Sequence, residues 1–85
     1  MDELMLDGNA AGGALEQIFG RDVTTAHGTC AGCGARDAVA SVHVFRSAGL
    51  VLRCPTCETV LMTIVESASR TWLSLRGLRS FELEA

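Results

Sequence analysis

The sequence predicts a small α+β fold that is mostly β, in which an antiparallel sheet and an N-terminal helix are held together by a metal ion. Three observations predict it. All four cysteines fall into two Cys-x-x-Cys pairs, Cys30 with Cys33 and Cys54 with Cys57. Short segments typical of strands lie between and after these pairs, and a segment with helical spacing of apolar residues precedes them.

The length and composition indicate one small domain. The chain has 85 residues, and 48% of them are hydrophobic, which is too apolar for a disordered tail. A domain of this size has little apolar core, so a metal ion, disulfides or a partner often supply the missing stability.

The predicted helix covers residues 8–19. Asp7 or Asn9 could cap its start, and Gly20 could end it. Two adjacent glycines inside it each cost about 1 kcal/mol relative to alanine, so the helix must dock on something. It could dock on its own sheet, or swap onto a partner or a second copy. Its apolar face consists of Ala11, Leu15, Ile18 and Phe19.

Six later segments have the pattern of strands or extended chain. One of them, residues 59–66, is apolar on both faces, as a central strand would be. In another, residues 71–75, Leu73 and Leu75 would face the core. Ser47-Ala48-Gly49 is typical of a turn, so we expect a small antiparallel sheet with hairpins. The six segments are residues 23–29, 39–46, 50–52, 59–66, 71–75 and 78–83.

The spacing of the cysteines predicts a zinc ribbon. Twenty residues separate Cys33 from Cys54, within the range expected of zinc sites. Two cysteines on one tight turn reach one ion, and a hairpin between two such turns completes a tetrahedron of four sulfurs at about 2.3 Å from the metal. We therefore expect a zinc-ribbon β domain over residues 23–85, with residues 1–22 as a helical segment packed on it or swapped from it.

The residues next to the cysteines agree with this interpretation. Gly32 and Gly34 flank Cys33, and glycine permits positive φ and close approach of amides to sulfur. Pro55 stiffens the second turn. Glu58 stands where Gly34 stands in the first turn, so the second turn is less ideal.

With four thiolates on one ion, no coordination position is left for water or substrate, so the site would be structural. Iron could fill the same tetrahedron and would make a rubredoxin-like electron carrier. Two disulfides or a redox Cys-x-x-Cys are further alternatives, although neither pair precedes a helical pattern.

The remaining polar residues do not predict an enzyme. His27 lies three residues before Cys30 and could replace a thiolate, but we expect it to be an exposed or hydrogen-bonded strand residue. His43 lies in the middle of a predicted strand, and we expect it to be a surface histidine. The acidic residues are scattered singly, so no nucleophile and base can be paired. No small-molecule substrate is inferred.

The net charge and the acidic N-terminus limit the classes of partner and the cellular location that we expect. Seven arginines, no lysine and ten acidic residues give a net charge of −3, and four thiolates on Zn²⁺ would make it more negative still. Such a charge disfavours nucleic acid as a partner. An acidic N-terminus, and no apolar run long enough for a membrane span, predict a cytoplasmic protein without a membrane partner. A reducing compartment favours metal over disulfides.

The segment 70–79 is the most suggestive surface. Alternation places Trp72 and Arg76 on one face, and an arginine beside an exposed tryptophan is typical of protein-binding hot spots. The same pair could stack a single-stranded base. Alternatively, Trp72 packs under the helix. The candidate partner-binding residues are Trp72, Arg76 and Arg79.

Four segments resemble a family of small bacterial four-cysteine zinc-ribbon proteins of unknown function. Its more particular motifs are a Leu-Asp-Gly-Asn opening and a Trp-Leu-x-Leu-Arg-Gly segment. The resemblance covers most of the chain and implies that Cys30, Cys33, Cys54 and Cys57 are metal ligands; it implies no activity. The segments are residues 6–11, 28–34, 52–55 and 72–77.

These observations predict a non-enzymatic zinc-binding module that docks a protein partner or self-associates. The alternatives are a nucleic-acid-binding ribbon of the transcription or translation type and, less favoured, an iron-binding electron carrier.

Overall fold

The computed structural model describes residues 5–84. In chain order, this part forms β1 (Met5–Asp7), the 3₁₀ helix η2 (Gly8–Ala11), α1 (Gly12–Phe19), β2 (His27–Cys30), β3 (Arg36–Ala38), the 3₁₀ helix η3 (Val39–Ser41), β4 (His43–Arg46), β5 (Leu50–Arg53), β6 (Val60–Glu66), β7 (Thr71–Ser74) and β8 (Leu78–Glu82).

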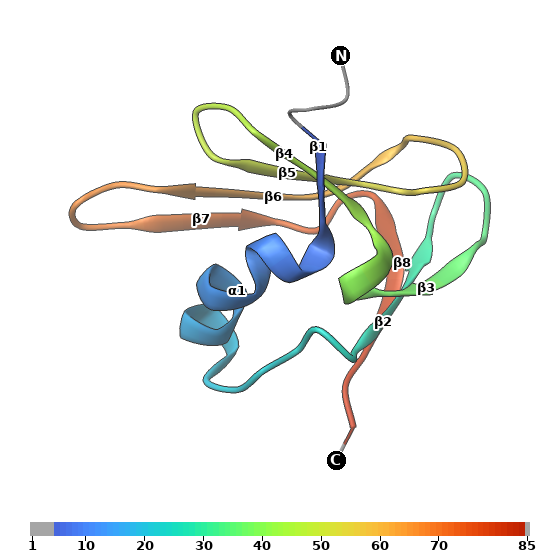
Figure 1. The fold of residues 1–85 in the computed structure, drawn as a ribbon, viewed down its shortest axis with the longest axis horizontal. Helices are drawn as coiled ribbons and strands as arrows, with labels where there is room; N and C mark the ends of the chain where they lie inside the picture. Colours follow the sequence, from blue (N-terminus) through green and yellow to red (C-terminus); the bar gives the residue numbers. More distant parts are fainter. Residues whose placement is uncertain (1–4, 85) are drawn as a thin grey trace.

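The described strands form two antiparallel sheets. The larger has the order β1-β4-β5-β6-β7, and the smaller has the order β3-β2-β8. In Figure 1, α1 and the smaller sheet both lie below the larger sheet as drawn. The predicted fold class is confirmed: the chain is mostly antiparallel β with one short N-terminal helix and a four-cysteine cluster.

The helix begins and ends where its sequence predicts. Asp7 Oδ1 accepts a hydrogen bond from the Asn9 N–H at 3.1 Å, and Gly20 ends the helix in the left-handed conformation at φ 75°. The first turn, however, is 3₁₀ instead of α. Leu15 is completely buried, so in this single chain the helix packs on its own fold. The predicted division between residues 22 and 23 stays a prediction.

Two sheets form instead of the single expected sheet because the predicted strand 39–46 is broken. Its first three residues form η3, which turns the chain, and only its end forms β4. The Val39 N–H donates to the Ala26 carbonyl at 2.9 Å, which anchors this turn beside β2. Consequently β3 pairs with β2 in the smaller sheet, whereas β4 pairs with β5 in the larger one.

Two strands of three residues each, β1 and β3, were missed by the sequence pattern. β1 pairs with β4, with Leu6 opposite Val44, and forms an edge of the larger sheet. Three residues are too few to show a period of two. The segment before the helix is therefore joined to the sheet by backbone hydrogen bonds as well as by the packing of α1.

The core lies between the larger sheet and the elements drawn below it in Figure 1, which are α1 and the smaller sheet. Buried side chains from α1, β4, β5 and β6 meet there, and both faces of β6 contribute, because Leu61 and Met62 are each buried. This confirms that residues 59–66 include an interior strand. The largest fully buried side chains are Leu15, Leu52, Ile64, Val23, Val44, Cys30 and Cys54.

Leu75 does not face the core as predicted. β7 ends at Ser74, and the Leu78 N–H donates to the Leu75 carbonyl at 3.1 Å in the turn that follows. The alternation of side chains between the two faces therefore ends before Leu75. Leu75 is exposed, whereas Leu73 packs against the core. No helix within residues 5–84 has the length and apolar character needed to cross a membrane.

Candidate metal centre

The two cysteine pairs lie on turns with the same hydrogen-bond pattern, residues 30–35 and 54–59. In each turn, the first cysteine donates its N–H to the carbonyl five residues later and accepts at its carbonyl from the N–H four residues later. All four bonds measure 2.9 Å. Each turn folds tightly enough to direct both of its sulfurs to one side.

These turns come from different sheets. The first connects β2 with β3 in the smaller sheet, and the second connects β5 with β6 in the larger sheet. Figure 1 shows them side by side at the right of the molecule. The cysteine cluster therefore lies where the two sheets meet.

The four sulfurs form one cluster. All Sγ atoms of Cys30, Cys33, Cys54 and Cys57 lie within 4.8 Å of one another. Two distances between the turns are 3.6 Å, from Cys30 to Cys57, and 3.7 Å, from Cys33 to Cys54. A tetrahedron of sulfurs with metal bonds of about 2.3 Å has edges of about 3.8 Å. The sulfurs therefore fit around a single tetrahedral ion.

Backbone amides surround the cluster on both turns. The N–H groups of Gly32 and Cys33 donate to Cys30 Sγ at 3.2 and 3.4 Å, and the Thr56 N–H donates to Cys54 Sγ at 3.4 Å. Cys57 Sγ lies 3.0 Å from the Thr59 hydroxyl. Such donors stabilise negative charge on sulfur, as metal-bound thiolates require.

One cysteine in each turn is buried and the other is exposed. Cys30 and Cys54 are each 1% exposed and belong to the apolar core, whereas Cys33 and Cys57 face solvent. The cluster is thus continuous with the core on one side and open to water on the other.

The pKa values of Cys30, Cys33 and Cys57 are shifted in different directions by their neighbours. The Thr59 hydroxyl and amide lower the pKa of Cys57 to about 6, and the Cys33 amide lowers that of Cys30. At Cys33 the Ala35 amide favours the thiolate, but desolvation and the neighbouring sulfurs outweigh it and raise the pKa to about 12. A divalent cation would offset the repulsion among four thiolates. The donor set therefore fits a metal ion of the zinc or iron type.

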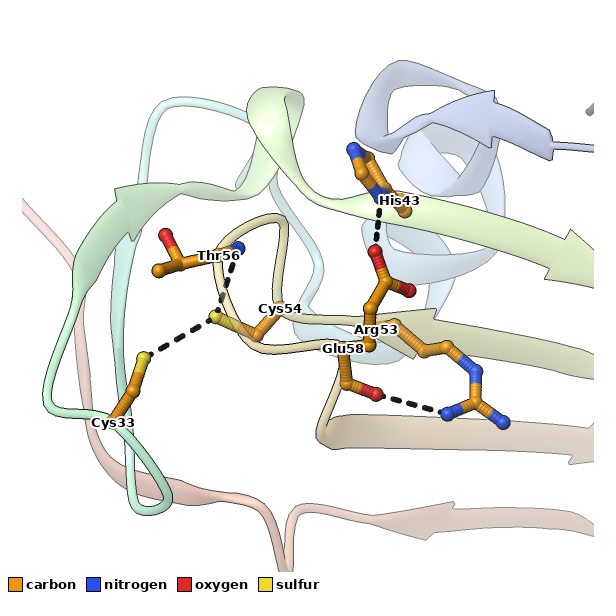
Figure 2. A network of polar contacts seen from close by, with 6 residues as sticks. All are labelled: Cys33, His43, Arg53, Cys54, Thr56 and Glu58. Atoms are coloured by element: carbon orange, nitrogen blue, oxygen red, sulfur yellow. Dashed lines mark hydrogen bonds and ion pairs between the residues drawn. The ribbon is translucent and has the colours of Figure 1, made fainter.

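A polar network braces the second turn, as Figure 2 shows. His43 Nδ1 lies 3.2 Å from Glu58 Oε2, and Arg53 Nη1 donates to the Glu58 carbonyl at 2.9 Å. Glu58 adopts φ 66°, in the left-handed region, as Gly34 does at φ 82°. This confirms the prediction that the second turn is less ideal, because Glu58 has a side chain and adopts a conformation that favours glycine.

Neither histidine belongs to the sulfur cluster. His27 lies in β2 opposite Ala38 and Glu82 and is half-buried. His43 is more than an ordinary strand residue, because its contact with Glu58 links β4 to the second turn. The alternation pattern could not show this contact, since the two residues lie fifteen positions apart.

Gly77 holds the first turn in place, a role that the sequence analysis missed. Its carbonyl accepts from the Ala31 N–H at 2.8 Å, and its own N–H donates to the Leu61 carbonyl at 3.1 Å. A Cβ at this position would overlap the Val60 carbonyl. The one available signal was its place at the end of the Trp-Leu-x-Leu-Arg-Gly segment.

The candidate partner-binding residues lie outside the cluster. Trp72 is 53% exposed on β7, so the alternative that it packs under the helix is wrong. Arg76 follows β7 and Arg79 lies in β8, and both are exposed. The structure thus leaves all three accessible, separate from the cysteines.

A hollow of about 410 Å³ lies between α1 and the turn that joins β4 to β5. Its charged lining residues are Arg46 and Glu66, and most of the others are small. No cysteine lines it, so it is separate from the sulfur cluster.

Comparison with known proteins places the chain in a family. Residues 1–85, the entire sequence, match DUF6510, a family of unknown function. No curated protein and no solved structure matches the chain significantly.

Proposed function

Because the chain belongs to DUF6510, a family of unknown function, its role has to be argued from its own residues, and we propose that it is a non-enzymatic zinc-ribbon module for protein interaction. The observation that carries the proposal is the single cluster formed by the four cysteine sulfurs, at the junction of the two sheets. The proposed location is the cytoplasm, where reduced cysteines are available to a metal.

Cys30, Cys33, Cys54 and Cys57 would hold the ion, and the ion would supply folding free energy and no reaction. Four thiolates complete a tetrahedral coordination shell, which leaves no position for water or substrate. We favour zinc over iron because a closed four-cysteine site on two such turns is typical of structural zinc.

The metal assignment is tested by purifying the chain without a metal-binding tag and measuring bound elements by mass spectrometry. We expect one zinc per chain and no visible absorbance. A stoichiometric iron content with visible charge-transfer bands would instead support the electron carrier.

Support for the interaction role comes from β7. Trp72 and Val65 are paired across β7 and β6 and are 53% and 38% exposed. Two large apolar side chains side by side at a sheet edge, near Arg70 and Arg76, have the composition of a binding surface. A protein partner would cover them, and a second copy is the alternative occupant.

The interaction role is tested by comparing wild type with Trp72→Ala in affinity capture from the native host. We expect Trp72→Ala to lose specific protein partners while retaining its zinc and its melting temperature. The control is Leu83→Ala, which removes another exposed apolar side chain away from β7. Equal capture by wild type and Trp72→Ala would contradict the proposal.

Nucleic-acid binding is a second candidate because Trp72 lies near arginines. In the described part of the chain, Arg70, Arg76 and Arg79 make no ion pair. An aromatic residue beside free arginines can stack and neutralise a single strand. A gel shift with single-stranded oligonucleotides over a range of salt concentrations separates the two candidates, and no retardation at low salt would remove this one.

A further inference from the structure

The free edge of β7 exposes unpaired backbone groups. Within residues 5–84, β7 pairs with β6 alone and forms an end of the larger sheet. The Gly77 N–H donates to the Leu61 carbonyl and the Ser67 N–H to the Arg70 carbonyl, so the odd-numbered residues of β6 direct their backbone groups toward β7. In an antiparallel pair such groups alternate between the two sides of a strand. Thr71 and Leu73 therefore direct their N–H and carbonyl groups to the open edge.

Two exposed apolar side chains lie side by side on one face of this edge. Trp72 lies opposite Val65, and both are exposed, whereas Leu73 on the other face packs against the core. A strand added next to β7 would place one of its side chains directly beside Trp72, at about 4.5–5.5 Å between Cβ atoms. An apolar side chain at that position would bury the tryptophan.

The charge near this edge is opposite in sign to that of the whole chain. Residues 67–80 contain Arg70, Arg76 and Arg79 and no acidic residue, and with Glu66, opposite Thr71 in β6, the local charge is still positive, although the chain carries −3. By contrast, Arg36 is neutralised by Glu82 in a two-bond ion pair at 2.8 Å. Arg70 and Arg76 stand just before and just after β7, one near each end of the edge.

We propose that the edge of β7 binds an extended acidic segment of a partner protein, which adds to the larger sheet as a sixth strand. Its backbone would pair with Thr71 and Leu73, an apolar side chain would cover Trp72, and acidic side chains on either side would face Arg70 and Arg76. The inference rests on the proposed interaction role and names the class of partner. This mode of binding takes its affinity from main-chain hydrogen bonds and its specificity from alternate side chains.

A second copy of the chain fits this edge less well. A symmetric antiparallel pair centred on Trp72 would place Arg70 opposite Ser74 of the other copy and diagonal to that copy's Arg76. The same like-charge neighbours would recur at the other end of the interface, and like charges on adjacent strands are destabilising. The arginines therefore favour an acidic partner over self-association.

Three labelled nine-residue peptides test the proposal by fluorescence anisotropy with zinc-loaded protein. The probe is Glu-Thr-Glu-Thr-Val-Thr-Glu-Thr-Glu, which presents valine and four glutamates on one face. A second peptide replaces each glutamate by lysine. The third replaces the two threonines beside valine by proline, which removes the N–H groups that would bond to the carbonyls of Thr71 and Leu73. We expect the first to bind with Kd below about 1 mM and the others at least tenfold more weakly.

Paired charge variants locate the site. Arg70→Glu/Arg76→Glu should weaken binding of the acidic peptide at least tenfold, since two attractions become repulsions. Arg21→Glu/Arg46→Glu makes the same charge change at exposed positions away from β7 and should leave the affinity within about twofold. Zinc content and circular dichroism should be unchanged in both variants, which excludes misfolding as the cause.

Several results would overturn the inference. They are no binding of the acidic peptide at about 1 mM, equal binding of the proline peptide, or equal loss in the two charge variants. A dimer in light scattering that Trp72→Ala abolishes would assign the edge to a second copy, and tight oligonucleotide binding lost in Arg70→Glu/Arg76→Glu would assign it to nucleic acid. If the peptides fail while Trp72→Ala still loses captured proteins, the inference fails and the proposed interaction role stands.

Discussion

Glu58 and Gly34 occupy the same position in the two cysteine turns but differ in what the conformation costs them. Both adopt the left-handed region, at φ 66° and 82°. Glycine does so freely, whereas a residue with a Cβ loses about 1–2 kcal/mol there. The contacts of Glu58 with His43 and Arg53 offset part of this strain. Only the contact with His43 uses the glutamate side chain, because Arg53 bonds to the backbone carbonyl.

Glu58→Gly should therefore stabilise the zinc-loaded protein by about 1 kcal/mol, because the relief of strain exceeds the value of one exposed polar contact with His43. Urea unfolding of the metal-loaded protein measures the effect. Glu58→Gln is the control, since it keeps the strain and removes only the charge, and should lower stability by less than about 1 kcal/mol. A glycine variant less stable than the glutamine variant would show that the His43 contact matters more than the strain.

What the sequence predicts at this scale depends on whether the relevant neighbours are near in the chain. The four cysteines are recognisable because their spacing alone is typical of a metal site. The steric need for glycine at position 77 is not recognisable, since it comes from the Val60 carbonyl, which only the fold brings near this residue. Leu75 was misplaced because alternation does not show where a strand ends.

At the scale of elements, η2 and η3 pack through backbone, with no room for a side chain between them. A Cβ on Gly8 would overlap the Val39 carbonyl, which explains the glycine of the Leu-Asp-Gly-Asn opening. Gly13, in α1, has no atom within 4 Å of where its Cβ would lie. The structure therefore has no space for a side chain at Gly8 but has space for one at Gly13.

We expect Gly8→Ala to destabilise the protein by about 2 kcal/mol or more, because η2 must move away from η3. Its matched control, Gly13→Ala, should stabilise by about 0.5–1 kcal/mol through helix propensity. Thermal unfolding of both variants with zinc bound measures the difference. Similar melting temperatures for the two would mean that η2 is not held against η3 in solution.

The ion pair of Arg36 with Glu82 ties β3 to β8 across β2. Arg36 holds the pKa of Glu82 below its ordinary value of 4.5, through its hydrogen bonds and its charge. The pair therefore contributes stability above the unfolded-state pKa, and this contribution is lost as pH falls through the lower folded-state pKa. Because both side chains are about half exposed, the contribution is small.

Glu82→Gln should accordingly be less stable than wild type at neutral pH, and the difference should shrink as pH falls below about 4.5. Unfolding measured across pH in both proteins gives this difference, and metal release in acid affects both alike. Glu84→Gln, which removes a nearby exposed carboxylate with no ion pair in residues 5–84, is the control. A difference that stays constant with pH would show that the ion pair does not form in solution.

Element types were easier to predict than their partners. The turn Ser47-Ala48-Gly49 follows from local pattern, and the structure confirms it within the β4–β5 hairpin, although only the end of the predicted strand 39–46 belongs to β4. The break at η3 was not predictable, because valines at 39, 42 and 44 suit either a continuous strand or a turn with buried apolar residues. Whether residues 39–46 form one strand, or a turn followed by a strand, determines whether one sheet or two is predicted.

At the scale of the whole molecule, the sulfur cluster lies at the junction of two sheets that share one small core. Cys30 ends β2 in the smaller sheet and Cys54 follows β5 in the larger one, and both are buried in the same core. A divalent metal ion here would close the junction and offset part of the repulsion among four thiolates. Its removal would leave the junction open, with Cys33 among neighbouring sulfurs that disfavour its thiolate.

Removing the metal should therefore unfold both sheets in one transition instead of loosening the turns alone. Structural zinc sites provide about 10 kcal/mol or more of apparent binding free energy, which exceeds the stability of most domains of this size. Amide spectra during titration with a strong chelator would show this, with Val44 of the larger sheet and Gly28 of the smaller one losing dispersion together. Cys30→Ser should have the same effect, whereas Ala31→Ser, which adds a hydroxyl to an exposed position of the same turn, should not. Native dispersion in the metal-free protein would mean that the apolar core suffices, and the ion would then need a role other than folding.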